Sequence, residues 1–348
     1  MTDPSLQSTA GHGQGSVVLV FRALQVGDML CAIPALRALR QQYPASTIIL
    51  VGLPWAHQLL PRYASLIDRI LPFPGHPSLP EQAADPAAFD SLLTHVRTLG
   101  ADLAIQLHGS GEVSNRIVDS FGAKRMGAFS RSEADCRSPA YVRWPEHGHE
   151  VQRCLSLIRA LATDTGEALH DDLADEALDF PLTDDDAIEL ARTGLPASLK
   201  GRDYVCIHAG ARSIERRWPT ACFAQVADAL AATGLSVVLT GSGVEWQLAE
   251  QVRQQMHYPA LNAALPYSLG ALAVLLRDAR LLVCNDTGVS HLAAAIRTSS
   301  VVVFTGSDPE RWAPLDHRRH VSLRDSEGVR AADVLRAAMR LLAEPATK

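Results

Sequence analysis

Short apolar runs alternate with longer amphipathic segments along most of the chain. Runs such as Val17–Phe21 and Leu281–Cys284 are almost wholly apolar, and the segments that follow them carry apolar residues at helical spacing. A strand that is buried on both faces reads as a continuous apolar run, and parallel strands are joined by crossover helices. The pattern therefore predicts an α/β fold with parallel sheets.

The alternation occurs twice. In the first half the expected strands are Val17–Phe21, Thr47–Val51, Arg69–Phe73, Leu103–Gln106 and Lys124–Phe129, and the helical segments are about Asp28–Gln42, Trp55–Tyr63 and Phe89–Leu99. In the second half the strands are Tyr204–Ile207, Ser236–Leu239, Leu281–Cys284 and Val301–Phe304, and the helices are Thr220–Thr233, Val244–Met256, Ser268–Arg277, one from Gly288, and Glu327–Leu342. Two doubly wound, Rossmann-like units are predicted.

An acidic stretch rich in alanine separates the two halves, between about Asp164 and Arg202. Its carboxylates lack the ordered spacing of a calcium loop, so we interpret it as an exposed linker with one solvated helix. The expected organisation is a flexible tail at 1–15, an N-terminal domain at 16–175, a C-terminal domain at 176–328 and a final helical segment at 329–348 that can pack back across the junction.

Composition narrows the class of protein. A chain of 348 residues is long enough for two domains, and its net charge of -6 gives no electrostatic footprint for nucleic acid. No run of about 18 apolar residues predicts a membrane span, and the first residues do not form a secretory signal. The six cysteines are scattered without zinc spacing, which is typical of reduced thiols. We expect a cytoplasmic protein with at most peripheral contact at the inner face of the cytoplasmic membrane.

The first candidate site follows the first strand. Gly27 and Asp28 lie between that strand and a helix, where ligands of open α/β sheets bind. Asp28 can cap the helix, or it can accept a proton from a substrate hydroxyl. Because the turn has no G-x-G-x-x-G, dinucleotide binding by this half is disfavoured.

The second and third candidate sites suit an anion. After the strand that ends at Ile207, Gly210, Arg212 and Ser213 form a loop that precedes the basic pair Arg216-Arg217. This segment is either a phosphate site or an exposed basic pair before a helix.

In the third site, a buried strand runs into a helix that begins with Asp286, Thr287 and Gly288, so unpaired amides and the positive dipole end are available to a diphosphate. A lone histidine such as His291 on an apolar helix is usually structural, but its place beside Thr287 and Gly288 favours a site. Glu245, after the Gly241 loop, is either a ribose ligand or an acid at a helix start.

Taken in order, these segments resemble glycosyltransferase family 9, the bacterial heptosyltransferases of lipopolysaccharide inner-core synthesis. The matching segments are Gly27-Asp28 with Pro34-Ala35-Leu36, Gln106-Leu107-His108-Gly109, Arg216-Arg217-Trp218-Pro219, the Gly241 loop with Glu245, and Asp286-Thr287-Gly288-Val289-Ser290-His291. The resemblance covers roughly residues 16 to 340. It implies a GT-B fold, in which two Rossmann-like doubly wound domains face each other across a cleft.

The resemblance also implies an activity: inverting transfer of a sugar, heptose from ADP-heptose, to a hydroxyl of a lipopolysaccharide core or a related glycan. Asp28 matches the catalytic base of the family, and Arg216 stands where the family typically has a lysine. The implied donor-binding residues are Arg212, Ser213, Arg216, Glu245, Tyr267, Asp286, Thr287, Gly288 and His291, and the acceptor-binding candidates are Gly27, His108 and Arg62.

In such a site a helix dipole and a cation stabilise the leaving diphosphate, so we expect no metal and no cofactor apart from the nucleotide-sugar donor. The expected partners are that donor and a glycan or glycolipid acceptor. The alternatives are a GT-B enzyme that uses a UDP- or GDP-sugar, and a non-catalytic homologue that binds a sugar nucleotide.

Overall fold

The computed structural model of the chain describes residues 15–132, 140–164, 175–324 and 328–344. Nearly all of the expected tail at 1–15 lies outside the described residues, and so do residues 165–174 of the acidic stretch. Cys136 is outside them as well, and the other cysteines are thiols.

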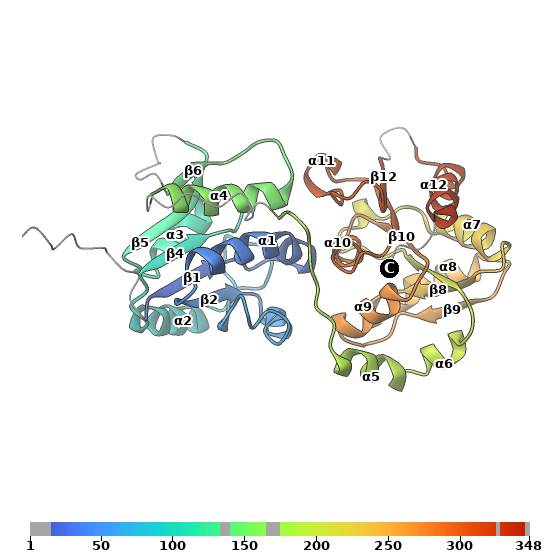
Figure 1. Cartoon of the computed structure of the whole chain (residues 1–348), viewed down its shortest axis with the longest axis horizontal. Helices are drawn as coiled ribbons and strands as arrows, with labels where there is room; N and C mark the ends of the chain where they lie inside the picture. The colour runs from blue at the N-terminus through green and yellow to red at the C-terminus, as the bar shows by residue number, and fades with distance from the viewer. Residues whose placement is uncertain (1–14, 133–139, 165–174, 325–327, 345–348) are drawn as a thin grey trace, which may run out of the picture. The chain divides into compact units, whose positions relative to one another are not determined.

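The chain divides into two compact units (Figure 1). The first comprises Met1–Leu24, Ala35–Pro145 and Arg153–Asp175, and the second comprises Gln25–Pro34, Glu146–Gln152 and Glu176–Lys348. Two short segments that we expected in the first domain, 25–34 and 146–152, therefore group with the second unit. Asp28 belongs to the first of these segments, so its surroundings are those of the second unit.

A parallel sheet of six strands forms the centre of the first unit, in the order β3-β2-β1-β4-β5-β6. The elements are β1 (Val17–Phe21), α1 (Val26–Gln42), β2 (Thr47–Gly52), η1 (Pro54–Leu59), β3 (Arg69–Pro72), α2 (Pro86–Thr98), β4 (Leu103–Gln106), α3 (Val113–Asp119), β5 (Arg125–Ser130), β6 (Tyr141–Arg143) and α4 (Glu150–Asp164). Side chains of α2 and α3 share one apolar core with β1, β2 and β4.

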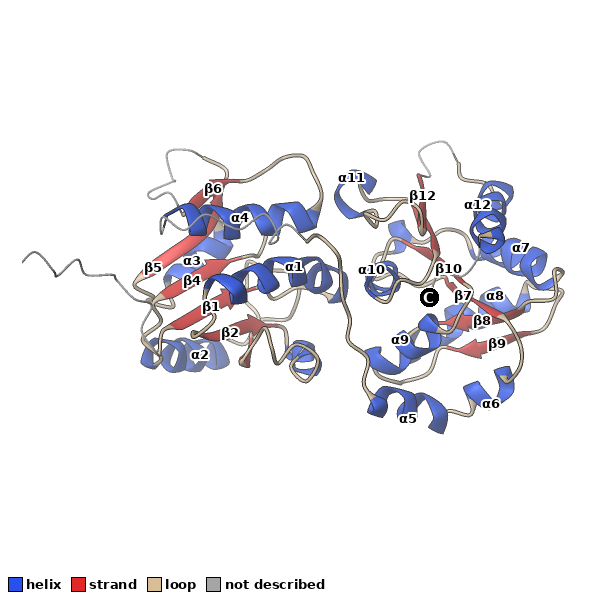
Figure 2. Cartoon of the chain, in the orientation of Figure 1, coloured by secondary structure: helices blue, strands red, loops and turns tan. Residues whose placement is uncertain are grey.

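The second unit repeats this topology in the order β12-β11-β10-β7-β8-β9, again all parallel (Figure 2). Its elements are α5 (Asp184–Arg192), α6 (Leu195–Leu199), β7 (Tyr204–His208), η4 (Ile214–Arg216), α7 (Thr220–Ala231), β8 (Ser236–Thr240), η5 (Gly243–Glu245), α8 (Trp246–Gln254), β9 (Ala260–Ala263), α9 (Leu269–Arg277), β10 (Leu281–Asn285), α10 (Gly288–Ala295), β11 (Ser300–Phe304), α11 (Pro309–Trp312), β12 (His320–Arg324) and α12 (Ala331–Ala343).

The central strands of this sheet are wholly buried, as their apolar runs predict. One face carries α7, α8 and α12, whose buried residues join the core formed by β7, β8, β10 and β11. Val334, Ala338 and Leu341 of α12 belong to this core. Among the described residues, no helix is long and apolar enough to cross a membrane.

The helix in the acidic stretch is less solvated than expected. Thr183 and Asp186 form a capping box that begins α5, and Asp186 and Leu190 are buried. The side chain of Glu189 accepts hydrogen bonds from the amide and the hydroxyl of Ser268, at the start of α9. The helix is therefore a packed part of the second unit, and the acidic residues in its first turn interact favourably with the positive end of the helix dipole.

A buried histidine predicts a pH dependence of stability. His320 begins β12, its ring Nδ1 lies 2.8 Å from Ser300 Oγ, and burial lowers its pKa from 6.5 to about 4. Between these values the unfolded chain binds a proton that the folded chain does not, so acidification destabilises the fold, by up to about 3 kcal/mol from this group.

We expect the urea concentration at the unfolding midpoint to decrease as the pH is lowered from 7 to 4.5. In His320→Gln this decrease should be smaller. If the midpoint of the variant depends on pH as strongly as that of the wild type, other groups account for the pH dependence.

Candidate active site

The predicted donor residues gather at one end of the second sheet. The strand order reverses between β7 and β10, and ligands of doubly wound sheets bind outside the carboxyl ends of the strands at such a point. The loop with Gly210, Arg212 and Ser213 follows β7, and Asp286 and Thr287 follow β10. Parallel strands bring these two loops side by side, although they are far apart in the sequence.

The helix after β10 begins within this group. Thr287 is the N-cap of α10, in an extended conformation with φ -156°, and Gly288 is its first helical residue. The first amides of a helix have no intrahelical acceptor, and together they carry a partial positive charge. This end of α10 is therefore suited to a phosphate group.

The first turn of α1 meets the first turn of α10. A Cβ on Gly27 would lie 2.7 Å from Cδ2 of His291 and 3.3 Å from the Cα of Gly288, and a Cβ on Gly288 would lie 3.2 Å from both the amide nitrogen of Gly27 and Cβ of Val26. Two glycines thus permit two helix starts to touch. Asp28 lies in this turn of α1, because the helix begins at Val26, two residues earlier than expected.

A carboxylate and an arginine lie beside the start of α10. Asp286 is buried, its Oδ2 lies 3.7 Å from Nη1 of Arg216, and it accepts a hydrogen bond from the hydroxyl of Ser307. Ser307 belongs to the loop after β11, where Thr305 Oγ1 also donates to the carbonyl of Glu215 at 2.8 Å. Arg216 is half exposed and its ion pair is long, so its guanidinium can turn toward an anion.

Asn285 is a site residue that sequence reasoning missed. It is fully buried at the end of β10, its Oδ1 accepts from the amide of Trp218 at 2.9 Å, and its Nδ2 donates to the carbonyl of Ala209 at 2.8 Å. It therefore ties the loop after β7 to the strand that precedes Asp286. The available signal was a polar residue at the end of an apolar strand, directly before Asp286.

Replacement of Asn285 by alanine leaves two buried backbone groups without a partner, and each costs about 1–3 kcal/mol. We expect Asn285→Ala to lower the free energy of unfolding by about 2–4 kcal/mol in urea titrations. Asn262→Ala is the control, since the Asn262 side chain also donates to the carbonyl of Trp246 at 3.3 Å and accepts from the amide of Ala264 at 3.1 Å, but is less buried than Asn285. Equal losses in the two variants would contradict the bridging role.

Glu245 begins a helical turn, which was one of its two predicted roles. Its Oε2 accepts from the amide of Ser242 at 2.8 Å and from the hydroxyl at 2.7 Å, which completes a capping box. Burial acts to raise the pKa of Glu245, but nearby His208 and these bonds outweigh it and lower the pKa. The other oxygen lies over Gly210, where a Cβ would overlap it, so Glu245 faces the loop after β7.

The remaining predicted donor residues lie in neighbouring loops. Arg212 is exposed and Ser213, half-buried, donates from its hydroxyl to Glu215. Tyr267 precedes α9, and its hydroxyl donates to the carbonyl of Ala263 at 2.6 Å. Burial raises the pKa of Tyr267, so the phenol stays protonated. The structure thus places Arg212 and Ser213 in the loop after β7, and Tyr267 beyond β9.

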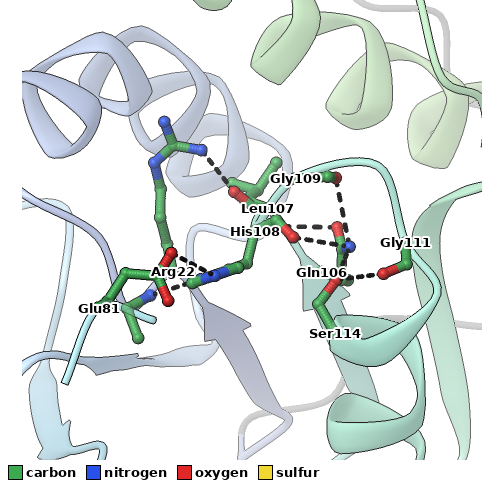
Figure 3. Close-up of polar contacts among 9 residues, drawn as sticks. Arg22, Glu81, Gln106, Leu107, His108, Gly109, Gly111 and Ser114 are labelled. Atoms are coloured by element: carbon green, nitrogen blue, oxygen red, sulfur yellow. Dashed lines mark hydrogen bonds and ion pairs between the residues drawn. The ribbon is translucent and has the colours of Figure 1, made fainter. Parts of the chain in front are cut away.

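His108 has a structural setting in the first unit (Figure 3). Its Nδ1 accepts from the amide of Ala23 at 3.2 Å, its Nε2 lies 3.7 Å from Glu81 Oε1, and its ring stacks on Phe21 at 5.0 Å. Only 5% of its surface is exposed. Both ring nitrogens therefore face protein atoms, and the geometry favours a structural role. Arg62 lies in the turn after η1 and is half-buried.

Gln106 organises the loop in which His108 lies, as Figure 3 shows. Its side-chain amide donates to the carbonyls of His108 at 3.1 Å and Gly109 at 3.3 Å, and to the hydroxyl of Ser114. Gly109 has φ +72°, which glycine adopts without strain. The Gln106–Gly109 segment of the family resemblance is thus a buried, hydrogen-bonded turn at the end of β4.

His291 lies at the junction of α1 and α10, and its electrostatic surroundings are acidic. Burial lowers its pKa, and the carboxylates of Asp286, Asp28 and Glu150 partly oppose that effect. Sequence reasoning identified two of these carboxylates and missed Glu150, which comes from the segment at 146–152. Burial is the larger effect, so the imidazole of His291 is neutral although Asp28 is near it.

Further neighbours of His291 were also missed. The ring of Trp312 meets it edge to face at 6.0 Å, and Arg311 lies over Trp312 at 4.6 Å. Arg311 forms an ion pair at 2.9 Å with Glu150, which is only 3% exposed. The sequence carried no spacing signal for this group, because its members come from α4 and α11, which are far apart along the chain.

A cavity of about 300 Å³ lies beside the middle and the end of α10, away from the first residues of the helix. Its wall includes His291, two arginines and two carboxylates, namely Arg297, Arg319, Glu176 and Asp316. Asp286, Thr287 and Gly288 do not line it. The residues at the start of α10 suit an anion. The cavity has as many carboxylates as arginines in its wall and is less suited to one, so the candidate site is the start of α10.

Within the part of the chain that the structure describes, no group of three or more histidine, cysteine, aspartate or glutamate residues is arranged to hold a metal ion.

Comparison with known proteins agrees with this geometry. A family model described as glycosyltransferase family 9 (heptosyltransferase) matches residues 91–333. The lipooligosaccharide heptosyltransferase 2 of Haemophilus ducreyi is 26% identical over 324 residues, which cover 89% of this chain and 89% of that protein. The family resemblance seen in the sequence is confirmed.

Solved structures share the fold at 20% identity. A glycosyl transferase family 9 protein from Veillonella parvula aligns with a TM-score of 0.78, covering 95% of this chain and 98% of that one. The E. coli ADP-heptose lps heptosyltransferase II aligns with a TM-score of 0.70, covering 94% and 98%. The two six-stranded parallel sheets and these matches confirm the GT-B fold class.

Proposed function

Because this chain belongs to glycosyltransferase family 9 and is a glycosyltransferase, we propose that it transfers heptose from ADP-heptose, with inversion, to a hydroxyl of a lipopolysaccharide core or a related glycan. The names of the Haemophilus and E. coli proteins support the sugar, the donor and the class of acceptor. The proposed acceptor is a glycan or glycolipid.

One observation carries the proposal: two helix starts meet through Gly27 and Gly288. This contact brings Asp28 of α1 beside the anion-binding end of α10, where Asp286 and Arg216 lie. An enzyme that transfers a sugar from a diphosphate needs a base for the attacking hydroxyl and positive charge for the leaving group. We propose that Asp28 supplies the first and that the start of α10 and Arg216 supply the second.

In the proposed reaction, Asp28 accepts the proton of the acceptor hydroxyl as its oxygen attacks the anomeric carbon. The bond from that carbon to the diphosphate breaks, and ADP leaves with the electron pair from the opposite face, which inverts the configuration. Amides at Thr287 and Gly288 and the guanidinium of Arg216 would stabilise the diphosphate. Asp286 would bind hydroxyls of the donor sugar.

The nucleotide would extend from the start of α10 toward the loops after β7 and β8. Arg212 and Ser213 would contact the diphosphate, the Oε1 of Glu245 would accept a ribose hydroxyl, and Tyr267 would line the adenine pocket. Calorimetric titration with ADP, UDP and GDP tests this arrangement. We expect tightest binding of ADP, and preference for UDP or GDP would overturn the choice of nucleotide.

We further propose that the reaction needs no metal, because the helix dipole and arginine side chains supply the positive charge. A chelator should therefore leave the rate unchanged. Loss of activity that Mg²⁺ or Mn²⁺ restores would contradict this part of the proposal.

The direct test is to incubate the purified protein with ADP-heptose and candidate acceptors. Release of ADP, and a product whose mass increases by one heptosyl unit, are the expected results. Anomeric coupling in the NMR spectrum of the product reports inversion or retention. Donor hydrolysis alone, with no product from any core or related glycan, would exclude the proposed transfer.

A further inference from the structure

The imidazole of His291 is enclosed by protein atoms. Only 3% of the residue is exposed, and its Nδ1 lies 3.5 Å from Sγ of Cys31, one helical turn beyond Asp28 in α1. Trp312 meets the ring edge to face, and Gly27 lies at the Cδ2–Nε2 edge, where even an added Cβ would be only 2.7 Å from Cδ2. The ring is therefore closely surrounded on these sides.

A second group holds this enclosure in place. Glu150 is buried and pairs with both Nε and Nη2 of Arg311, at 3.0 and 2.9 Å. The Cζ atom of Arg311 in turn lies over the Trp312 ring, which contacts His291. The ion pair between the buried carboxylate of Glu150 and the partly exposed guanidinium of Arg311 thus supports the position of the Trp312 ring and, through it, that of the imidazole.

An imidazole in this position is neutral, since burial lowers the pKa of His291 against the carboxylates around it. A neutral imidazole carries one N–H, and its other nitrogen accepts a hydrogen bond. Which nitrogen keeps the proton is decided by the hydrogen bond that the other one makes.

The two ring nitrogens face different groups. Nδ1 faces the thiol of Cys31, and an imidazole nitrogen is a stronger acceptor than a thiol sulfur, so the favoured bond runs from S–H to Nδ1. The proton of the ring then belongs to Nε2. Nε2 lies at the edge of the ring that faces Gly27, where a Cβ would be 3.4 Å away.

We propose that Cys31 fixes His291 as the Nε2–H tautomer, so that a neutral histidine presents a hydrogen-bond donor in the turn that holds Asp28. Cys31 is then a positioning residue that acts through His291. A neutral imidazole with its proton on Nε2 does not take up the proton that Asp28 must accept. This last consequence rests on the proposed function, whereas the tautomer does not.

The tautomer is tested on the wild-type protein, without substrate. With ¹⁵N-labelled histidine, two-bond ¹H–¹⁵N spectra distinguish a protonated from an unprotonated ring nitrogen, and the signals absent from His291→Gln assign the residue. We expect an unprotonated Nδ1 and a protonated Nε2 at neutral pH. A protonated Nδ1, or a doubly protonated ring, would overturn the proposal.

Variants of Cys31 test its part in this arrangement. Cys31→Ala should allow the Nδ1–H form to appear in the spectrum, whereas Cys31→Ser retains a hydroxyl donor and should keep the wild-type pattern. An unchanged tautomer in Cys31→Ala would remove Cys31 from the mechanism. Cys154→Ala is the matched control, because Cys154 is also a buried helical cysteine but belongs to the first unit.

Kinetics provide the second readout. Loss of one hydrogen bond that orients His291 should lower kcat of Cys31→Ala about fivefold to tenfold, with the KM for the donor nearly unchanged. Cys31→Ser should recover most of the loss.

Glutamine places its amide nitrogen near the position of Nε2, so His291→Gln should be more active than His291→Asn. The reverse order would contradict a donor at Nε2. If no transfer occurs in the wild type, the proposed function fails while the tautomer remains measurable.

Discussion

Asp28→Asn should abolish turnover while leaving donor binding intact. The amide keeps the size of the carboxylate but cannot accept the proton of the acceptor hydroxyl, and removal of a general base lowers rates about 10²–10⁴-fold. We expect a loss near the upper end, because attack on an uncharged hydroxyl depends on this proton transfer. ADP release under saturating donor gives kcat, and calorimetry with ADP should give a Kd within about threefold of the wild type.

The alternative role of Asp28 is structural, and a matched variant separates the two. Asp28 lies in the first turn of α1, where an acid gains about 0.3–1 kcal/mol from the helix dipole. Asp85 is the N-cap of α2, and its side chain accepts from the amide of Ala88 at 3.0 Å. Asp85→Asn should change stability slightly and kcat hardly at all. If Asp28→Asn behaves in the same way, the carboxylate serves the helix and not the reaction.

Gly27→Ala should impair both catalysis and stability. The added Cβ would lie 2.7 Å from Cδ2 of His291, and this ring cannot move away because Cys31 and Trp312 enclose it. The two helix starts must therefore separate, and a shift of about 1 Å in a reacting group can cost about 10²-fold in rate. We expect kcat/KM to fall by about that factor.

Overpacking of this kind costs about 1–3 kcal/mol, which exceeds the roughly 0.5–1 kcal/mol that alanine gains over glycine in a helix. Urea unfolding measures the net effect. Gly52→Ala is the control, because a Cβ there meets its nearest atoms at 3.4 Å, an ordinary contact distance. A Gly27→Ala variant with the stability and activity of Gly52→Ala would show that the helix starts need not touch.

The strands at the centre of each sheet were predictable, and those at the edges mostly were not. β1, β4, β7 and β10 are almost entirely buried, so their apolar runs appear directly in the sequence. β6, β9 and β12 are edge strands, and their side chains are mostly half-buried or exposed. A short strand with one partner needs no continuous apolar run, so these three strands leave little signal in the sequence.

Helix boundaries were predicted within a few residues, and one small difference matters for the site. α1 begins at Val26 rather than at Asp28, so the aspartate lies inside the first turn. We also omitted α4 (Glu150–Asp164), although Val151, Cys154, Leu155 and Ile158 are buried at helical spacing. The signal for that helix was present in the sequence.

The sequence by itself determined the α/β class, the two repeats, the family and most of the polar residues at the strand ends, because each of these depends on local periodicity or on a contiguous motif. The contact of Gly27 with His291 and Gly288, and the grouping of 25–34 and 146–152 with the second unit, emerged only from the tertiary structure.

The same is true of the bridge made by Asn285 and of the neighbours that enclose His291. These features join residues that lie far apart along the chain, and no local pattern records such a contact. Asp28 could be proposed as the base from its motif, but its place beside the start of α10 depends on how the chain folds.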